Sequence, residues 1–184
     1  MLAVAEREEL PVAAARAGSP EAWDTLFRRY QLPLYAYVFE LLRSEQASLD
    51  VVQETLIRAA RHFGSLRDDN RFGSWLFAIA HRNCVDRWRK DGRESPLEAE
   101  FAEALPDFDG DPSELLIRRE EELSFMKLIE QLPRQQRSAL LLHYLEDFSL
   151  EEIAGITGTQ LGTVKSRLHY ARRTLRRLME ESVP

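Results

Sequence analysis

The amino-acid sequence predicts an all-α protein of two small helical domains joined by an acidic, flexible linker. Apolar residues recur at steps of three and four along several segments, as they do on the buried face of a helix. Only 8 Gly and 8 Pro occur in 184 residues, which leaves few of the turns that an all-β fold needs. The segment "ESPLEAEFAEALPDFDGDPSE", residues 94–114, has no Lys or Arg, and its acids and prolines are unsuited to a packed core.

The composition limits which cellular compartment the protein occupies and which disulfide or metal chemistry it can have. Hydrophobic residues make up 44% of the chain and charged residues 30%, as in a soluble globular protein. The start lacks the features of a secretion signal, and no apolar run approaches the length of a membrane span, so we expect a cytoplasmic protein without membrane insertion. The single Cys84 excludes an internal disulfide. His81 and Cys84 are only two potential ligands, so neither a metal nor another cofactor is expected.

The first domain is expected at residues 19–91, after an N-terminal tail at residues 1–18. Its first helix starts near residue 22 and has an aromatic-rich apolar stripe, typical of core packing. The next helix is "ASLDVVQETLIRAARHF". Its expected core residues are Val51, Val52, Thr55, Leu56 and Ala59, and its expected outer residues are Asp50, Gln53, Glu54 and Arg58. A polar strip of this kind is usually only solvated.

A polar loop, "GSLRDDNR", precedes the last helix of this domain, "FGSWLFAIAHRNCVDRWRK". Aromatic and Arg side chains beside such a loop could stack on unpaired bases, although packing is the simpler explanation. Asn83 and Asp86 fall on the apolar side of this helix, so we expect them to bond to one another or to a neighbouring helix.

The linker is expected at residues 92–111 and the second domain at residues 112–184. Asp111 can cap a helix that begins with Pro112 and runs to about Gln131. Pro133 then starts a further helix. Helical spacing predicts that one side of this helix is buried, with Leu140, Leu141, Tyr144 and Leu145.

The end of the chain has the pattern of a helix-turn-helix. Ser149 and Glu152 form an S-x-x-E capping box that opens a short helix, and Gly158 ends it. The final helix has one apolar stripe and one basic face. The stripe comprises Val164, Leu168, Ala171, Leu175 and Leu178. The opposite side comprises Gly162, Ser166, His169, Tyr170, Arg173 and Arg177, flanked by Lys165, Arg172 and Arg176.

The charge of this final helix is unlike that of the whole chain. The formal net charge is -6, yet no Asp or Glu occurs from Ile153 to Met179. Such a face predicts a DNA surface, on which Lys and Arg release counterions from phosphates. The alternative is a charged helix that is merely solvated.

Taken in order, these segments resemble one family. "DVVQETLIRAARHF", "FGSWLFAIAHRNCVDRWRK", the acidic linker and "LPRQQRSALLLHYLEDFSLEEIAGITGTQLGTVKSRLHYARRTLRRL" are similar to extracytoplasmic-function sigma factors, the two-domain minimal class of sigma-70-type bacterial initiation factors. The resemblance covers about residues 22–178. It implies a factor that binds core RNA polymerase and directs promoter recognition, DNA melting and initiation without catalytic chemistry of its own. Thr159 and Gln160 depart from the family pattern, which leaves the start of the recognition helix open.

The resemblance also implies a role for each part. Residues 19–91 correspond to region 2, which binds the clamp of the largest polymerase subunit and opens the minus-10 element. Residues 112–184 correspond to region 4, which reads the minus-35 element and contacts the flap of the second-largest subunit. An anti-sigma factor is an expected further partner, since many relatives are held inactive by one.

Site residues follow from this resemblance by position. The implied polymerase-binding residues are Asp50, Gln53 and Glu54. The implied minus-10 residues are Asp69, Asn70, Arg71, Phe72, Arg82, Arg87 and Arg89. The implied minus-35 residues are Lys165, Ser166, Arg167, His169, Tyr170, Arg172, Arg173, Arg176 and Arg177.

The two alternative classes of protein are a stand-alone DNA-binding regulator and an enzyme. A self-contained repressor or activator would bind its operator alone through the helix-turn-helix and use the first half for dimerisation or ligand sensing. A sigma factor instead binds specifically when polymerase holds both domains at promoter spacing. An enzyme is not supported, because four scattered His and one Cys form no Ser-His-Asp, P-loop or H-E-x-x-H spacing.

Overall fold

The structure is a computed structural model that describes residues 10–90, residue 92 and residues 126–182. Throughout these residues every regular element is helical, which confirms the all-α class. The first half contains α1 (Val12–Arg16), α2 (Pro20–Leu42), α3 (Glu45–His62) and α4 (Phe72–Lys90), with the 3-10 turns η1 (Phe63–Ser65) and η2 (Asp69–Arg71). The second half contains α6 (Arg134–Tyr144), α7 (Leu150–Thr157) and α8 (Leu161–Ser182), preceded by helical residues 126–130. The expected linker and most of the helix expected from Asp111 lie outside the described residues.

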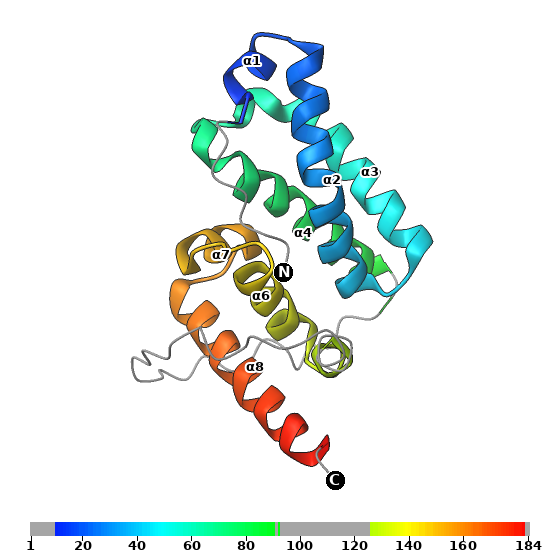
Figure 1. Cartoon of the computed structure of the whole chain (residues 1–184), viewed down its shortest axis with the longest axis vertical. Coiled ribbons are helices and arrows are strands. Elements are labelled where there is room, and N and C mark those ends of the chain that lie inside the picture. Colours follow the sequence, from blue (N-terminus) through cyan, green and yellow to red (C-terminus); the bar gives the residue numbers. More distant parts are fainter. Residues whose placement is uncertain (1–9, 91, 93–125, 183–184) are drawn as a thin grey trace.

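The first half is a bundle of α2, α3 and α4 with α1 across one end (Figure 1). Ser19 caps α2 through a 3.2 Å bond from the Ala22 amide to the Ser19 hydroxyl, and Pro20 takes the first helical position. The core is aromatic-rich, as the sequence predicts. Among its fully buried side chains are Leu26, Leu34, Tyr37, Phe72 and Phe77. Buried Asn83 donates to Thr55 Oγ1 at 3.0 Å, so its partner comes from a neighbouring helix.

Helix α1 lies inside the segment expected to be a tail. Val12 and Ala15 are buried against the bundle. Arg16 donates to Leu66 O at 3.0 Å and pairs with Asp69 at 2.5 Å. The end of the expected tail therefore packs as part of the first half and fixes the loop after α3.

The helix-turn-helix of the second half forms as the sequence predicts. Ser149 and Glu152 make a complete capping box at the start of α7, and Gly158 ends α7 in the left-handed conformation with φ of 66°. Val164, Leu168, Ala171 and Leu175 are all buried. Leu145 is exposed, because α6 ends at Tyr144 and Leu145 is its C-cap residue.

The two halves pack against each other along a seam between α2 and α4 on one side and α6 and α7 on the other (Figure 1). Phe77 of α4 and Phe148, before α7, meet edge to face with ring centroids 5.2 Å apart. The Arg134 guanidinium lies 5.3 Å from the centre of the Trp88 ring. Both apolar and polar groups therefore hold the halves together.

The seam also changes the acidity of a carboxyl group. Glu146, in the turn between α6 and α7, lies near Arg29 and Tyr30 of α2. Burial raises the pKa of Glu146 to about 7, against the attraction of Arg29, and the neighbouring Asp147 raises it further. Packing of the halves therefore favours the protonated carboxyl.

Glu146→Gln should change how stability depends on pH. The folded pKa of Glu146 is about 7 and its ordinary value is 4.5, so its stabilising contribution is complete below 4.5 and is lost as the pH rises through 7. The free energy of unfolding of the wild type minus that of the variant should therefore fall by on the order of 2 kcal/mol across this range. Urea denaturation at a series of pH values measures the difference. Glu151→Gln, at an exposed site, is the matched control for the loss of a carboxylate. A flat difference for Glu146→Gln would show that its carboxyl is solvated.

Candidate nucleic-acid interface

The recognition helix α8 begins at Leu161. The sequence left this start undefined, because Thr159 and Gln160 depart from the family pattern. The Thr159 amide donates to Ala154 O at 3.0 Å, and the Thr157 and Thr159 hydroxyls lie 2.9 Å apart. The Val164 amide donates to Gln160 O at 3.1 Å, so Gln160 supplies the first helical acceptor. Backbone bonds and the pair of Thr hydroxyls thus fix the turn that contains Thr159 and Gln160.

The basic face of α8 lies opposite its buried stripe, as helical periodicity requires. The exposed members are Lys165, Arg173, Arg176 and Arg177, and the half-buried members are His169, Tyr170 and Arg172. Arg167, also half-buried, lies beside the buried stripe and near His81 of α4. Arg177 also pairs with Glu181 at 3.8 Å. The arrangement offers a long row of cations that suits the phosphates of duplex DNA.

Two of these cations are held by side chains of α6. Arg172 Nε donates to the Tyr144 hydroxyl at 2.8 Å, and its guanidinium lies 5.7 Å from the centre of the Tyr144 ring. Arg167 donates to the Gln135 side-chain carbonyl. Neither support was predictable from the sequence: helical spacing placed Tyr144 in the core, and nothing in the sequence pairs residues 32 or 28 positions apart.

Ser166 does not belong to the exposed face, so the expectation for this residue is corrected. It is buried, and its hydroxyl donates to Gly162 O, one turn earlier, at 3.0 Å. A short hydroxyl side chain can turn back to its own helix in this way, whereas the long Arg and Lys side chains extend outward.

The loop before α4 is held in one conformation by contacts of the Asp68 side chain. The Asp68 carboxylate accepts from the Asn70 backbone amide at 3.0 Å and from the Asn70 side chain at 3.2 Å. It also lies 3.6 Å from Arg71 Nε. Asn70 and Arg71 are exposed, whereas Asp69 is tied to Arg16. Asp68 and Arg16 are supporting residues that the sequence analysis missed, although an Asp two residues before an Asn is a recognisable turn signal.

Phe72 is also corrected, because it is fully buried and cannot face DNA in this structure. Its ring packs against Tyr30, Phe63 and Trp75 with centroid distances of 5.3, 6.1 and 6.0 Å. Helical position explains this, since the first residue of α4 begins the apolar stripe. Further along α4, Arg82 and Arg89 are exposed and Arg87 is half-buried.

A separate exposed face lies on α3. Asp50, Gln53 and Glu54 share it, because Val51, Val52 and Thr55 point into the core. Leu49 and Ile57 flank Gln53 at four-residue spacing and are 49% and 39% exposed. Large apolar residues beside polar ones are typical of a protein-binding surface. The sequence analysis named the polar residues of this face and missed the apolar ones.

The described residues carry no helix that is both long enough and apolar enough to cross a membrane. They also bring together no cluster of three or more His, Cys, Asp or Glu side chains that could hold a metal ion. His81 instead lies with Nδ1 2.8 Å from the Tyr37 hydroxyl, and burial lowers its pKa to about 4.

Comparison with known proteins agrees with this geometry. The family model for Sigma-70 region 2 matches residues 26–94, and that for Sigma-70, region 4 matches residues 122–175. The RNA polymerase sigma-H factor of Pseudomonas aeruginosa is 31% identical over 95% of both chains. The ECF RNA polymerase sigma-E factor of Escherichia coli is 33% identical, covering 91% of this chain and 92% of that protein. In the co-crystal structure of the sigma factor RpoE with the anti-sigma factor NepR from Bartonella quintana, the matching chain has a TM-score of 0.65 and 26% identity over 87% of this chain and 98% of its own.

A two-part helical protein with a helix-turn-helix, matched by both sigma regions in order, is a transcription initiation factor and not an enzyme. The chain belongs to the extracytoplasmic-function sigma factors of the sigma-70 family. It binds core RNA polymerase and directs promoter recognition and initiation.

Tyr144→Phe should weaken promoter binding although Tyr144 carries no charge. The variant keeps the ring under Arg172 but loses the hydroxyl that accepts from Nε, so Arg172 must be ordered when DNA binds. We expect the holoenzyme to bind promoter DNA roughly threefold more weakly, in line with the loss of one hydrogen bond. The slope of affinity against salt should not change, because no cation is removed.

Fluorescence anisotropy with a labelled promoter fragment at several salt concentrations measures both quantities. Tyr35 is a half-buried tyrosine of α2, so Tyr35→Phe is the matched control and should leave the affinity and its salt dependence unchanged. If Tyr144→Phe and Tyr35→Phe bind alike, Tyr144 does not position Arg172 for DNA.

Proposed function

We propose that α8 binds the minus-35 promoter element. The positive charge of its face is the observation that supports this assignment most strongly. The face has no acid from Ile153 to Met179, although the whole chain is acidic. Lys165 lies one turn from the start of α8, where a recognition helix reaches base edges. Arg173, Arg176 and Arg177 lie further along and hold phosphates and register, and Arg167, His169, Tyr170 and Arg172 complete the surface.

The minus-10 element is assigned to the loop at η2 and to the exposed side of α4. Asn70 and Arg71 project from a loop that Asp68 and Arg16 hold in shape. A preformed loop suits capture of a flipped base, because unstacking costs a few kcal/mol and a fixed pocket adds no further ordering cost. Arg82, Arg87 and Arg89 supply cations along α4 for the adjacent backbone.

The α3 face docks on the clamp of the polymerase. Asp50, Gln53 and Glu54 supply its polar contacts, and exposed Leu49 and Ile57 supply apolar area beside them. The domain limits follow as region 2 at residues 19–91 and region 4 at residues 112–184, joined by residues 92–111. Region 4 is assigned to the flap of the second-largest subunit.

We also assign an anti-sigma factor as a partner that controls this protein. The structure of a 26% identical sigma factor was solved with the anti-sigma factor NepR, and its likeness to this chain spans both halves. We place the protein in the cytoplasm, where its polymerase and promoters are, and the described helices include none that could span a membrane.

Transcription from genomic DNA tests the proposal as a whole. The purified protein is mixed with sigma-free bacterial core polymerase and fragmented genomic DNA of the host, and RNA 5′ ends are sequenced. Discrete starts that share two upstream elements are expected. Specific binding to an operator without polymerase, and no protein-dependent starts, would make the chain a self-contained regulator instead.

Arg173→Glu should weaken promoter-specific initiation while leaving polymerase binding intact. The substitution replaces an exposed cation on the α8 face by an anion, so we expect roughly a tenfold loss of promoter affinity. Filter binding of the holoenzyme and co-purification with core polymerase measure the two properties. Arg28→Glu, at an exposed site on α2, is the matched control. Loss of polymerase binding together with promoter binding would contradict separate surfaces.

Gln53→Ala combined with Glu54→Ala should impair polymerase docking. Both side chains are exposed on α3, so the change removes polar contacts without opening the core. We expect the dissociation constant for core polymerase to rise roughly tenfold, the size of an interface hot spot. Surface plasmon resonance measures it, with Gln160→Ala and Glu180→Ala on the second half as the matched pair. Unchanged co-purification would remove α3 from the docking surface.

A further inference from the structure

We propose that Arg16 of α1 is a positioning residue of the minus-10 site, and that it sets how strictly the η2 loop selects the base it captures. Arg16 holds η2 in one rotation, so that Asn70 and Arg71 meet the DNA strand from a fixed direction. The inference rests on the proposed assignment of this loop to the minus-10 element. It gives a function to a helix that lies outside both matched family models.

Helix α1 offers a firm support because it is fixed to the first half. A helix of this length is not stable alone, so it depends on its contacts. Val12 and Ala15 are 1% and 3% exposed. A tight turn follows, in which the Gly18 amide donates to Ala15 O at 3.0 Å and Gly18 takes a φ of 91°, a conformation that suits glycine. The backbone at Arg16 is therefore held by packing and by this turn.

One guanidinium contacts the loop after α3 at three points, and α1 lies beside this loop (Figure 1). Arg16 Nη2 donates to Leu66 O at 3.0 Å and lies 2.5 Å from Asp69 Oδ1. The guanidinium carbon of Arg16 lies 5.3 Å from the centre of the Phe63 ring, within reach of a cation–π interaction. The three contacted residues belong to η1, to the segment between the 3-10 turns and to η2. Arg16 thus connects the whole length of the loop to α1.

The other polar contacts of the loop are local. Within the described residues, the hydrogen bonds and ion pairs of residues 64–71 that do not involve Arg16 join near neighbours in the chain. Such bonds preserve the shape of the loop but do not set its direction relative to the helices. Edge-to-face packing of Phe63 and Phe72, with centroids 6.1 Å apart, closes the base of the loop. Arg16 is then the polar contact that ties η2 to another helix.

Anchoring one residue of η2 fixes the direction of the other two. A 3-10 helix has three residues per turn, so successive side chains point about 120° apart. Asp69, Asn70 and Arg71 are the three residues of η2. With Asp69 held against α1, Asn70 and Arg71 project in the remaining directions, and both are exposed. Asp69 therefore supports the site, and Asn70 and Arg71 contact the base.

A fixed direction matters more for selectivity than for attraction. A flipped base is selected by hydrogen bonds to its edge, and these bonds need donors and acceptors at set positions. A freed loop still attracts the strand through Arg71, but it has the capturing rotation only part of the time. If that fraction is about one fifth, the affinity for the preferred base falls about fivefold. The affinity for other bases changes little, because they do not make these bonds.

The test compares Arg16→Met with Arg28→Met. Met keeps much of the side-chain length and removes the guanidinium. Arg28 on α2 pairs with Asp24 at 2.7 Å, so Arg28→Met removes an exposed ion pair away from the loop and is the matched control. The side chains of Arg16 and Asp69 are 39% and 40% exposed, so losing their pair should leave the fold intact. Circular dichroism and co-purification with core polymerase check this.

The probe is a labelled single-stranded oligonucleotide with the non-template minus-10 element of a promoter found by the transcription experiment. Fluorescence anisotropy measures how the holoenzyme binds this strand with each of the four bases at each position. At the captured position, we expect the wild type and Arg28→Met to discriminate equally between bases. Arg16→Met should lose about fivefold of this discrimination, because only its affinity for the preferred base falls.

Asp69→Ala removes the same contact from the loop side and leaves the packing of α1 unchanged. Because Arg16 acts through Asp69, this variant should also lose about fivefold of the discrimination, and the double variant should lose little more than either single variant. Hydrogen exchange measures the loop without DNA. Exchange of residues 64–71 in the free chain should be roughly fivefold faster in both single variants and unchanged in Arg28→Met.

Two results would overturn the inference. One is unchanged discrimination in Arg16→Met, even with a lower melting temperature, because the contact would then be structural only. The other is additive losses in the double variant, because Asp69 would then contact the base independently of Arg16. If the wild-type holoenzyme has no base preference at any position of the element, the proposed function of the loop fails, and the inference with it. Normal wild-type preference that Arg16→Met retains overturns the inference alone.

Discussion

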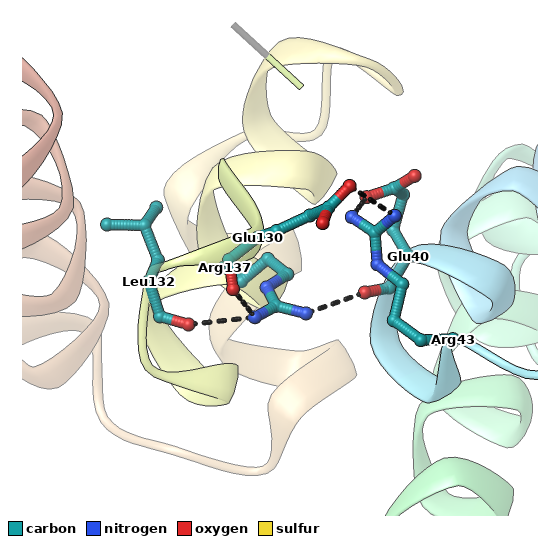
Figure 2. A network of polar contacts seen from close by, with 5 residues as sticks. All are labelled: Glu40, Arg43, Glu130, Leu132 and Arg137. Atoms are coloured by element: carbon teal, nitrogen blue, oxygen red, sulfur yellow. Dashed lines mark hydrogen bonds and ion pairs between the residues drawn. The ribbon is translucent and has the colours of Figure 1, made fainter. Parts of the chain in front are cut away.

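The buried guanidinium of Arg137 ties α6 to the end of α2 (Figure 2), beside the aromatic contacts of the seam. Arg137 must bond to acceptors wherever it is buried, and the carbonyls it finds are those that two helices leave unpaired at their ends. Burial lowers the pKa of Arg137, and nearby Glu40 and Glu130 act against that shift. Burial likewise raises the pKa of Glu40, and Arg43 opposes it. Opposite charges at the seam therefore offset part of the cost of burying Arg137 and Glu40.

Helical periodicity lets the same helices serve the seam and the functional faces. On α4, Phe77 and His81 face the second half, while Arg82 and Arg89 are exposed. On α6, Arg137 and Ser138 face the first half, while Gln135 and Tyr144 support Arg167 and Arg172 of α8. One helix, α6, thus contacts both the first half and the basic side chains of α8.

Much of the candidate site was predictable because it depends on local pattern. The capping box, the left-handed Gly158 and the stripe from Val164 to Leu175 are all short-range features, and the structure has each of them. The supports were not predictable. Arg16 reaches Asp69 and Tyr144 reaches Arg172 across long stretches of chain, and no residue spacing encodes such pairs. Ser166 was wrong for a related reason, since a rotation of 100° per residue gives a direction but not what a side chain of a given length meets there. Phe72 was wrong because the resemblance supplied its DNA role, whereas its place on the apolar stripe of α4 buries it.

The sequence by itself determined the main helices, the capping box, the helix-turn-helix and the basic face, because these depend on propensity, period and charge along the chain. The family followed from the resemblance of its segments to those of known sigma factors. Only the tertiary structure decided that α1 joins the first half, that Leu49 and Ile57 stay exposed, and that the halves meet at Tyr37, Arg43 and Arg137. The physical reason is that burial is a property of three-dimensional neighbours. Whether a Tyr hydroxyl finds its partner 101 residues away, or an Arg guanidinium 97 residues away, depends on how whole helices pack, which no local pattern contains.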